Sequence, residues 1–400
     1  MWCNRNSLNR FAPTFRSWIK ISGKKLFGAL APRFFSVTRR LRGQSFFHHP
    51  VSKSRQGPLC TTLVSAFAVL IHTTLLHGQP LDTVAAVDQP SIRRIDRIRI
   101  AEAFALGKAI GPEIWNGWEN PPFALLLVTH DLEFLIRHPS PSNDFTFLQF
   151  DSLLNADIFY RRREYTTNLL ATFPAVKGIS TIVIGQAEST EARTSTPWIL
   201  TLMHEHFHQM QTTDPTYYTD VRTLDLSKGD NTGMWMLNYP FPYDSKTIND
   251  EFLLLSRKLR EAVRYSGEPI LQVKLDHYLA LRNSFKSRLS NDDFKYLSFQ
   301  LWQEGIARYT ELKIAEAAAD HHTPSEEFQS LKDFTSFGRE ARRIRLSILG
   351  SLWSLSLNTS KRSAFYPFGA AEGLLLDSVN PLWRKRYFTE KFFIERYFER

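Results

Sequence analysis

Cysteine is almost absent from this 400-residue chain, which contains only Cys3 and Cys60. Both precede residue 80, where we expect the folded domain to begin. Residues 80–400 therefore form no disulfide bond and offer no thiolate to a metal or a substrate. They also contain no glycine-rich phosphate-binding loop, so the sequence does not indicate nucleotide binding. A large hydrophobic core needs no disulfide bonds, and the composition remains compatible with export from the cell.

Aspartate and glutamate are absent from residues 1–57, although this segment holds 12 of the 50 Lys and Arg residues. The segment accounts for the formal net charge of +10, because residues 58–400 carry 38 basic and 40 acidic side chains. The expected domain is therefore close to neutral, and we predict no nucleic-acid partner for it.

A long apolar run, residues 59–76, follows Lys53 and Arg55. A basic segment, an apolar stretch and small residues near its end are typical of a signal peptide, which we place at 58–79. The run is also long enough for an uncleaved membrane anchor, which would then be the domain's membrane contact. We predict an exported protein, periplasmic or secreted. The basic leader 1–57 leaves two alternatives open: translation that starts near Val51, or a mitochondrial transit peptide.

Hydrophobic periodicity in residues 80–400 changes from strand-like to helical along the chain. Apolar residues in 91–110 are spaced as in an amphipathic helix. The short apolar runs 123–129 and 132–137 predict a hairpin, and the β-branched run 179–185 predicts a strand. Later helices are expected near 246–265, 269–288, 292–319, 325–356 and 370–377. This order predicts an α+β domain over 80–400, with a strand-containing part to about 215 and a helical part over 216–400.

Residues 204–208 read His-Glu-His-Phe-His. On a helix, His204 and His208 stand one turn apart on the same face, as two ligands of one metal ion would. Glu205 lies beside them, where it can accept a proton from water. This H-E-x-x-H pattern is that of zinc hydrolases. His206 points to the opposite, apolar face, and we predict that it is a hydrogen-bonded core histidine.

The expected helix has clear signals at both ends. Thr196 is suited to cap it and Pro197 to occupy its first position. Asp214 precedes a proline and is expected to end it. Asp214 is also a candidate third metal ligand, since metzincin-like enzymes carry theirs six residues after the second histidine. Those enzymes require a glycine where this chain has Gln211, so we favour a ligand from elsewhere.

The favoured third ligand is Glu304. It begins the pattern Glu304-Gly305-x-Ala307-x-Tyr309-x-Glu311, and here the sequence resembles the gluzincins, H-E-x-x-H metallopeptidases with a glutamate ligand on a later helix. The resemblance implies that His204, His208 and Glu304 bind Zn²⁺ and that Glu205 is the general base. It also implies a zincin-like fold, in which a small mixed sheet and the active-site helix precede a mainly helical half.

Two features depart from the better-known gluzincins. The interval between His208 and Glu304 is 95 residues long, enough for two inserted helices. Arg308 stands where thermolysin-like enzymes place an aspartate that orients a zinc-bound histidine. Asp225 and Asp230 are alternative candidates for that orienting role.

Three further predictions concern the surroundings of the site. Gluzincins often stabilise the oxyanion with a downstream tyrosine or histidine, and Tyr366, placed just before a helix, is our candidate. The aromatic segment 229–244 predicts either a substrate wall with Tyr239 and Tyr243 or a packed surface loop. By the same resemblance, residues 180–185 would form a sheet edge that pairs with an extended peptide.

The sequence thus predicts a zinc-dependent hydrolase, most simply a peptidase acting on peptides or proteins outside the cytoplasm. Three alternatives remain: a non-catalytic zincin-like binding protein of the envelope, a zinc hydrolase of non-peptide bonds, and a coincidental motif in a helical membrane-attached protein. The sequence does not predict the oligomeric state.

Overall fold

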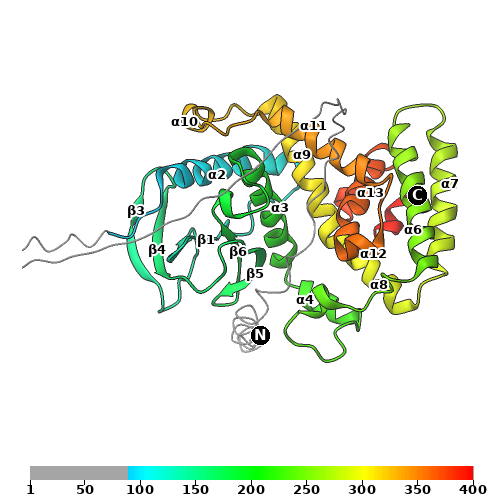
Figure 1. The fold of residues 1–400 in the computed structure, drawn as a ribbon, viewed down its shortest axis with the longest axis horizontal. Helices are drawn as coiled ribbons and strands as arrows, with labels where there is room; N and C mark the ends of the chain where they lie inside the picture. The colour runs from blue at the N-terminus through cyan, green and yellow to red at the C-terminus, as the bar shows by residue number, and fades with distance from the viewer. Residues whose placement is uncertain (1–88, 400) are drawn as a thin grey trace, which may run out of the picture. The chain divides into compact units, whose positions relative to one another are not determined.

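Residues 89–399 are described by the computed structural model and combine a mixed β-sheet with a larger set of helices (Figure 1). The domain is therefore α+β, as predicted. The predicted leader at 1–57 and the signal peptide or anchor at 58–79 lie outside the described residues. Within residues 89–399, no helix combines the length and the hydrophobicity that crossing a bilayer requires.

The sheet formed by the described residues has six strands in the order β3-β4-β2-β1-β6-β5. β1 and β6 are parallel, and every other neighbouring pair is antiparallel. The strands are β1 (Leu125–Val128), β2 (Leu132–Ile136), β3 (Thr146–Asp151), β4 (Ala156–Arg162), β5 (Leu170–Val176) and β6 (Ile179–Gly185). The predicted hairpin is confirmed, because Leu125 of β1 lies opposite Ile136 of β2.

The prediction that residues 180–185 form a sheet edge is wrong. β6 is interior, between β1 and β5, and β5 is the edge strand. β5 and β6 form a hairpin through Lys177 and Gly178, whose φ angles of 45° and 75° suit a two-residue turn. Pro174 interrupts the alternating pattern of β5, but a proline is tolerated on an edge strand, where its missing N–H removes no interior hydrogen bond.

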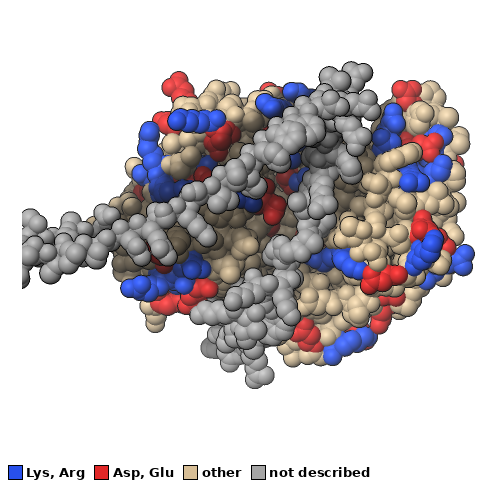
Figure 2. Space-filling view, in the orientation of Figure 1, with Lys and Arg blue, Asp and Glu red and all other residues tan. Residues whose placement is uncertain are grey.

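Helices cover one face of the sheet and continue into a second, all-helical region (Figure 1). Alternate strand residues such as Leu125, Leu127 and Ile184 join the helices in one large core. Leu126, Val183 and their neighbours form a smaller cluster on the opposite face. Charged residues of both signs are interspersed over the face shown in Figure 2.

The helices follow the predicted order, with some different bounds. They are α2 (Arg94–Ile114), α3 (Ser195–Thr213), α4 (Tyr217–Thr223), α5 (Trp235–Asn238), α6 (Lys246–Arg264), α7 (Leu271–Lys286), α8 (Asn291–Gln300), α9 (Ile306–His321), α10 (Glu326–Gln329), α11 (Phe337–Ser351), α12 (Leu357–Ser360) and α13 (Phe365–Val379). A π-helical turn, Leu301–Gly305, joins α8 to α9. The single helix predicted over 325–356 is wrong, because residues 330–336 separate α10 from α11.

The helix that carries the histidines begins two residues earlier than its sequence signal suggests. α3 starts at Ser195, and Thr196 donates its hydroxyl to the carbonyl of Thr335 (2.7 Å) instead of capping the helix. The cap comes from Asp333, whose carboxylate accepts from the Ser195 backbone N–H (2.9 Å) and hydroxyl (2.7 Å). A negative charge at a helix N-terminus is favourable, so this distant loop residue stabilises the first turn.

Candidate metal centre

α3 places His204 and His208 toward the helical half of the domain. α3 packs against the edge of the sheet formed by β5 and β6 and, on another side, against α9. Both histidines are buried, with 7% and 8% of their surface exposed. Their Nε2 atoms face each other at 3.2 Å, so the two rings offer lone pairs to a common point.

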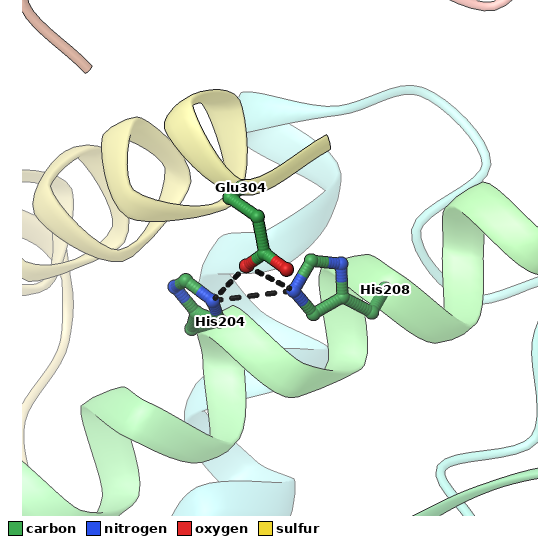
Figure 3. A group of neighbouring side chains, drawn as sticks. All are labelled: His204, His208 and Glu304. Atoms are coloured by element: carbon green, nitrogen blue, oxygen red, sulfur yellow. Dashed lines mark hydrogen bonds and ion pairs between the residues drawn. The ribbon is translucent and has the colours of Figure 1, made fainter. Parts of the chain in front are cut away.

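Glu304 completes the group from the π-helical turn (Figure 3). Its Oε2 lies 3.4 Å from Nε2 of His208 and 3.7 Å from Nε2 of His204. A π-helical turn rotates the side chains of a helix relative to the preceding turn and is frequently found at functional sites. The predicted ligands, nearly 100 positions apart in sequence, are thus brought together by the fold.

The spacing of these atoms fits a metal ion. Each residue offers one ligand atom, and the three atoms lie within 4.8 Å of one another. Two nitrogens and one oxygen about 2.0–2.1 Å from a tetrahedral zinc ion would be about 3.3–3.4 Å apart. The observed separations of 3.2, 3.4 and 3.7 Å are close to that spacing. His204, His208 and Glu304 could therefore hold a metal ion with little movement.

Close helix packing fixes the turn that carries Glu304. A Cβ atom on Gly305 would lie 2.5 Å from Cα of Gly369 in α13, which is impossibly close. The two glycines therefore let the π-helical turn and α13 touch along their backbones. Gly305 thus serves close packing next to the residue that carries the Glu304 carboxylate.

Gln211 orients His208. Its Oε1 accepts a hydrogen bond from Nδ1 of His208 (2.7 Å), which fixes the ring so that Nε2 is directed at Glu304. The Gln211 amide in turn donates to the hydroxyl of Tyr387 (2.7 Å) and to the carbonyl of Gln303 (3.2 Å). Gln211 is buried, and both ends of its amide are thus occupied.

His204 has a different neighbour on its Nδ1 side. Oε2 of Glu311 lies 3.8 Å from that nitrogen and is paired with Arg308. Glu311, seven residues after Glu304, thus places a carboxylate on the Nδ1 side of His204. The predicted orienting residues are wrong: Asp225 pairs with Lys228, and Asp230 accepts hydrogen bonds within its own loop.

Glu205 is held by the edge strand. The hydroxyl of Thr172 on β5 donates to Oε2 of Glu205 (2.6 Å) and also contacts its backbone carbonyl (3.1 Å). Glu205 is buried, and the hydrogen bond fixes the direction of its carboxylate. Thr172 was not predicted from sequence, although Pro174 on the same strand is a signal of a sheet edge.

Tyr366 lies at the site but not where the sequence suggested. It belongs to the first turn of α13 rather than preceding a helix, and its ring is stacked parallel to that of His204 at 6.0 Å. Its hydroxyl accepts a hydrogen bond from Nη1 of Arg362 (3.0 Å). The same nitrogen donates to Oε1 of Glu304 (3.0 Å). Arg362 therefore bridges Tyr366 and the proposed ligand, and no sequence pattern singled it out.

The charges of the centre attract a cation. Burial disfavours a charged His208, but the carboxylates of Glu304 and Glu205 outweigh it and raise the pKa of His208 to about 9. Burial likewise opposes the charge of Glu304, yet His208 and Arg362 hold the pKa of that carboxyl well below its usual range. The field that attracts a proton to this place attracts a metal cation as well.

The remaining histidine and aspartate candidates lie outside the group. The prediction for His206 is confirmed: it is buried, contacts Gln209 (2.7 Å) and the Trp118 carbonyl (3.2 Å), and stacks on Phe123. Burial lowers the pKa of His206 to about 4. Asp214 follows the end of α3 and pairs with Lys391 (3.0 Å).

The aromatic segment 229–244 packs against the helices beside the centre. Tyr239 stacks on Tyr296 with ring centroids 4.4 Å apart and donates its hydroxyl to Asp293 (3.1 Å). Tyr243 packs against Phe365 at the start of α13. These contacts favour the packed-loop alternative for Tyr239.

Comparison of the chain with models of known protein families, with curated proteins and with solved structures finds no match. Any function therefore has to be argued from the residues and geometry of the centre itself.

Proposed function

We propose that this protein is a zinc-dependent hydrolase with a zincin-like arrangement, and that it cleaves peptide bonds. The observation that carries the proposal is the convergence of His204, His208 and Glu304, with ligand atoms spaced for a tetrahedral ion. Glu205 lies beside the two histidines on the same helix. Two imidazoles and one carboxylate are the ligand set of catalytic zinc sites that keep a fourth position open.

Each side chain has a defined part in the proposed reaction. A zinc ion held by the three ligands would act as a Lewis acid toward a carbonyl oxygen and would make water more acidic. Glu205 accepts the proton of the attacking water and passes it to the leaving nitrogen. Thr172 holds the Glu205 carboxylate in place, and Gln211 holds His208. Tyr366, whose hydroxyl is held by Arg362, supplies a donor for the charge that develops on the carbonyl oxygen.

The edge strand supports a peptide substrate. Among the strands of residues 89–399, only β6 neighbours β5, and Thr172 on β5 contacts Glu205. An extended peptide can add to such an edge through backbone hydrogen bonds, which bring its carbonyl groups past the neighbouring helix. The role first proposed for residues 180–185 thus passes to β5.

Metal content and turnover together test the proposal. We expect one equivalent of zinc in the purified protein, marked loss in Glu304→Ala, and no loss in the control Glu327→Ala, whose side chain is exposed. Glu205→Gln should keep the metal and lower peptide hydrolysis by about 10²- to 10⁴-fold.

The outcomes separate the alternatives. A parent protein that binds no metal even when zinc is supplied would refute the metal centre. Stoichiometric zinc without hydrolysis of peptide, ester or amide substrates would favour a non-catalytic binding protein. Hydrolysis of esters or non-peptide amides alone would show that the enzyme does not cleave peptide bonds. The proposed metal centre would still stand.

A further inference from the structure

Arg362 has an unused hydrogen-bonding edge beside the metal centre. Its contacts with Glu304, Tyr366 and Gln300 all use one nitrogen, Nη1. Among the described residues, none accepts a hydrogen bond from Nε or Nη2. The side chain is 25% exposed, so Arg362 is not sealed inside the packed core. The N–H groups of Nε and Nη2 lie in one plane and point in parallel, the geometry that grips a carboxylate with two hydrogen bonds.

The backbone around Arg362 is held in an unfavourable conformation. Lys361, which precedes it, has φ 48° and ψ −134°, a region that residues with a side chain rarely adopt. Asn249 accepts hydrogen bonds from the backbone N–H of Leu357 (2.7 Å), and Asp244 accepts from Lys361. These contacts fix the short α12 and the turn after it. Strain that the surroundings maintain in this way is typical of functional sites, and the strained residue directly precedes Arg362.

We propose that the Nε/Nη2 edge of Arg362 binds the free C-terminal carboxylate of a peptide, so that the enzyme removes residues from the C-terminal end. This inference rests on the proposed hydrolase function and names its substrate class. In a peptide, the terminal carboxylate carbon lies within about 4 Å of the last amide carbonyl carbon. Nη1 of Arg362 is 3.0 Å from one oxygen of Glu304, whose other oxygen faces the two histidines. A carboxylate held by the Nε/Nη2 edge of the same guanidinium would thus lie beside the centre, within the reach of the last peptide bond.

The reaction is a balanced hydrolysis of that last bond. Water adds its hydroxyl to the carbonyl carbon, and the C–N bond breaks. The proton taken up by Glu205 goes to the nitrogen of the released amino acid. Arg362 stays protonated throughout, because an arginine guanidinium does not titrate in this range. The specificity thus comes from a fixed positive charge and a planar fork of donors.

Paired peptides that differ only in a terminal carboxylate or amide test the proposal. Hydrolysis is measured with the zinc-loaded wild type, and binding is measured by calorimetry with zinc-loaded Glu205→Gln. The free acid should be favoured by about 10- to 100-fold in both measurements, the worth of a charge-assisted pair. Adding Arg362→Gln should bring the acid-to-amide ratio near one in both hydrolysis and binding. Arg362→Lys should give an intermediate ratio, because lysine keeps the positive charge but lacks the two parallel N–H donors. Arg288→Gln, a surface control, should leave them unchanged.

Two results would overturn the proposal. In the first, the wild type hydrolyses the free-acid and amide peptides equally well, and the zinc-loaded Glu205→Gln protein binds them equally well. This is expected if Arg362 only holds Glu304 in place. The other is an acid preference that survives Arg362→Gln in protein whose zinc content is verified. If neither peptide is hydrolysed but the acid binds more tightly through Arg362, the carboxylate site stands and the hydrolase function fails. Cleavage of internal bonds without regard to the terminus would keep the hydrolase and refute the carboxylate site.

Discussion

Gln211 shows how one buried amide can orient a histidine of the proposed metal centre. Its carbonyl oxygen accepts from His208, while its NH₂ group is tied to Tyr387 and to the backbone of the π-helical turn that carries Glu304. It therefore orients one proposed ligand and connects it mechanically to another. A residue of this kind has no motif in the sequence, because its role depends on partners about 90 and 176 positions away.

Replacing Gln211 should weaken metal binding without unfolding the protein. Gln211→Leu removes the acceptor that fixes the His208 ring, so we expect zinc affinity to fall by about 10- to 100-fold. The measurement is a competition titration with a chelator, with thermal melting to verify the fold. Gln329→Leu changes an exposed glutamine of α10 and should leave the affinity unaltered. Unchanged zinc affinity in Gln211→Leu would show that His208 needs no orienting partner.

At the scale of helices and strands, patterns of local periodicity were sufficient for much of the fold. The α6 and α7 helices lie within two residues of their predicted bounds, since each shows a continuous helical pattern between turn residues. β3, β4 and β5 were not predicted. Exposed aromatic residues such as Phe147 and Phe150 obscure the polar face of β3, and Pro174 obscures β5.

Local sequence patterns also predicted only part of the candidate site. His204, Glu205 and His208 share one helix turn, so their spacing alone places them together. Glu304 required the resemblance to a second motif. Arg362 and Thr172 contact the centre only through tertiary packing, and no local pattern encodes such contacts.

Substitution of Gly369 tests whether the close contact between the π-helical turn and α13 holds Glu304 in place. Gly369→Ala would place a Cβ about 2.7 Å from Cα of Gly305 and 2.9 Å from the Leu301 carbonyl oxygen. Overpacking of this kind costs about 1–3 kcal/mol, and separating the two helices would also displace Glu304. We expect a lower free energy of unfolding in urea together with weaker zinc binding.

Gly350→Ala is the matched control for this substitution. Gly350 lies in the last turn of α11, and a Cβ there would meet no atom within 4 Å. Alanine should raise the free energy of unfolding by about 0.4–1 kcal/mol, because it restricts the unfolded chain. If both variants behaved alike, the close approach of Gly305 and Gly369 would not be important for the centre.

On the scale of the whole molecule, a network of ion pairs joins segments that surround the start of α3. Arg99 is buried and pairs with Asp96, with Glu188 before α3 and with Asp333 after α10. Asp333 also caps α3. The helix that carries the histidines is therefore anchored to both the first helix and the later helical region.

This network predicts how stability depends on pH. Burial opposes the charge of Glu188, but hydrogen bonds from Arg93 and Arg99 outweigh it and lower its pKa from 4.5 to about 2. Its stabilising effect is thus complete above about pH 5 and is lost as pH falls toward 2, because the unfolded state takes up the proton first. Glu188 is half-exposed, so solvent screens the effect.

Urea unfolding at pH 7, 5, 4 and 3 would measure this dependence. The wild type should lose more stability than Glu188→Gln between pH 5 and 3, since only the wild type carries this titrating carboxylate. Parallel pH profiles in the two proteins would contradict the assignment.

The parallel pairing of β1 with β6 has a consequence for the order in which the chain assembles. Fifty residues separate the two strands, and α3 begins only nine residues after β6 ends. The ends of this long loop must meet before the central pair exists, and pairings of that kind are slow to form. Glu304 then arrives from a segment synthesised nearly 100 residues after His208. A chain that holds a metal ion at all three ligands has therefore already docked its helical half against α3, so metal retention would report that this late step of folding is complete.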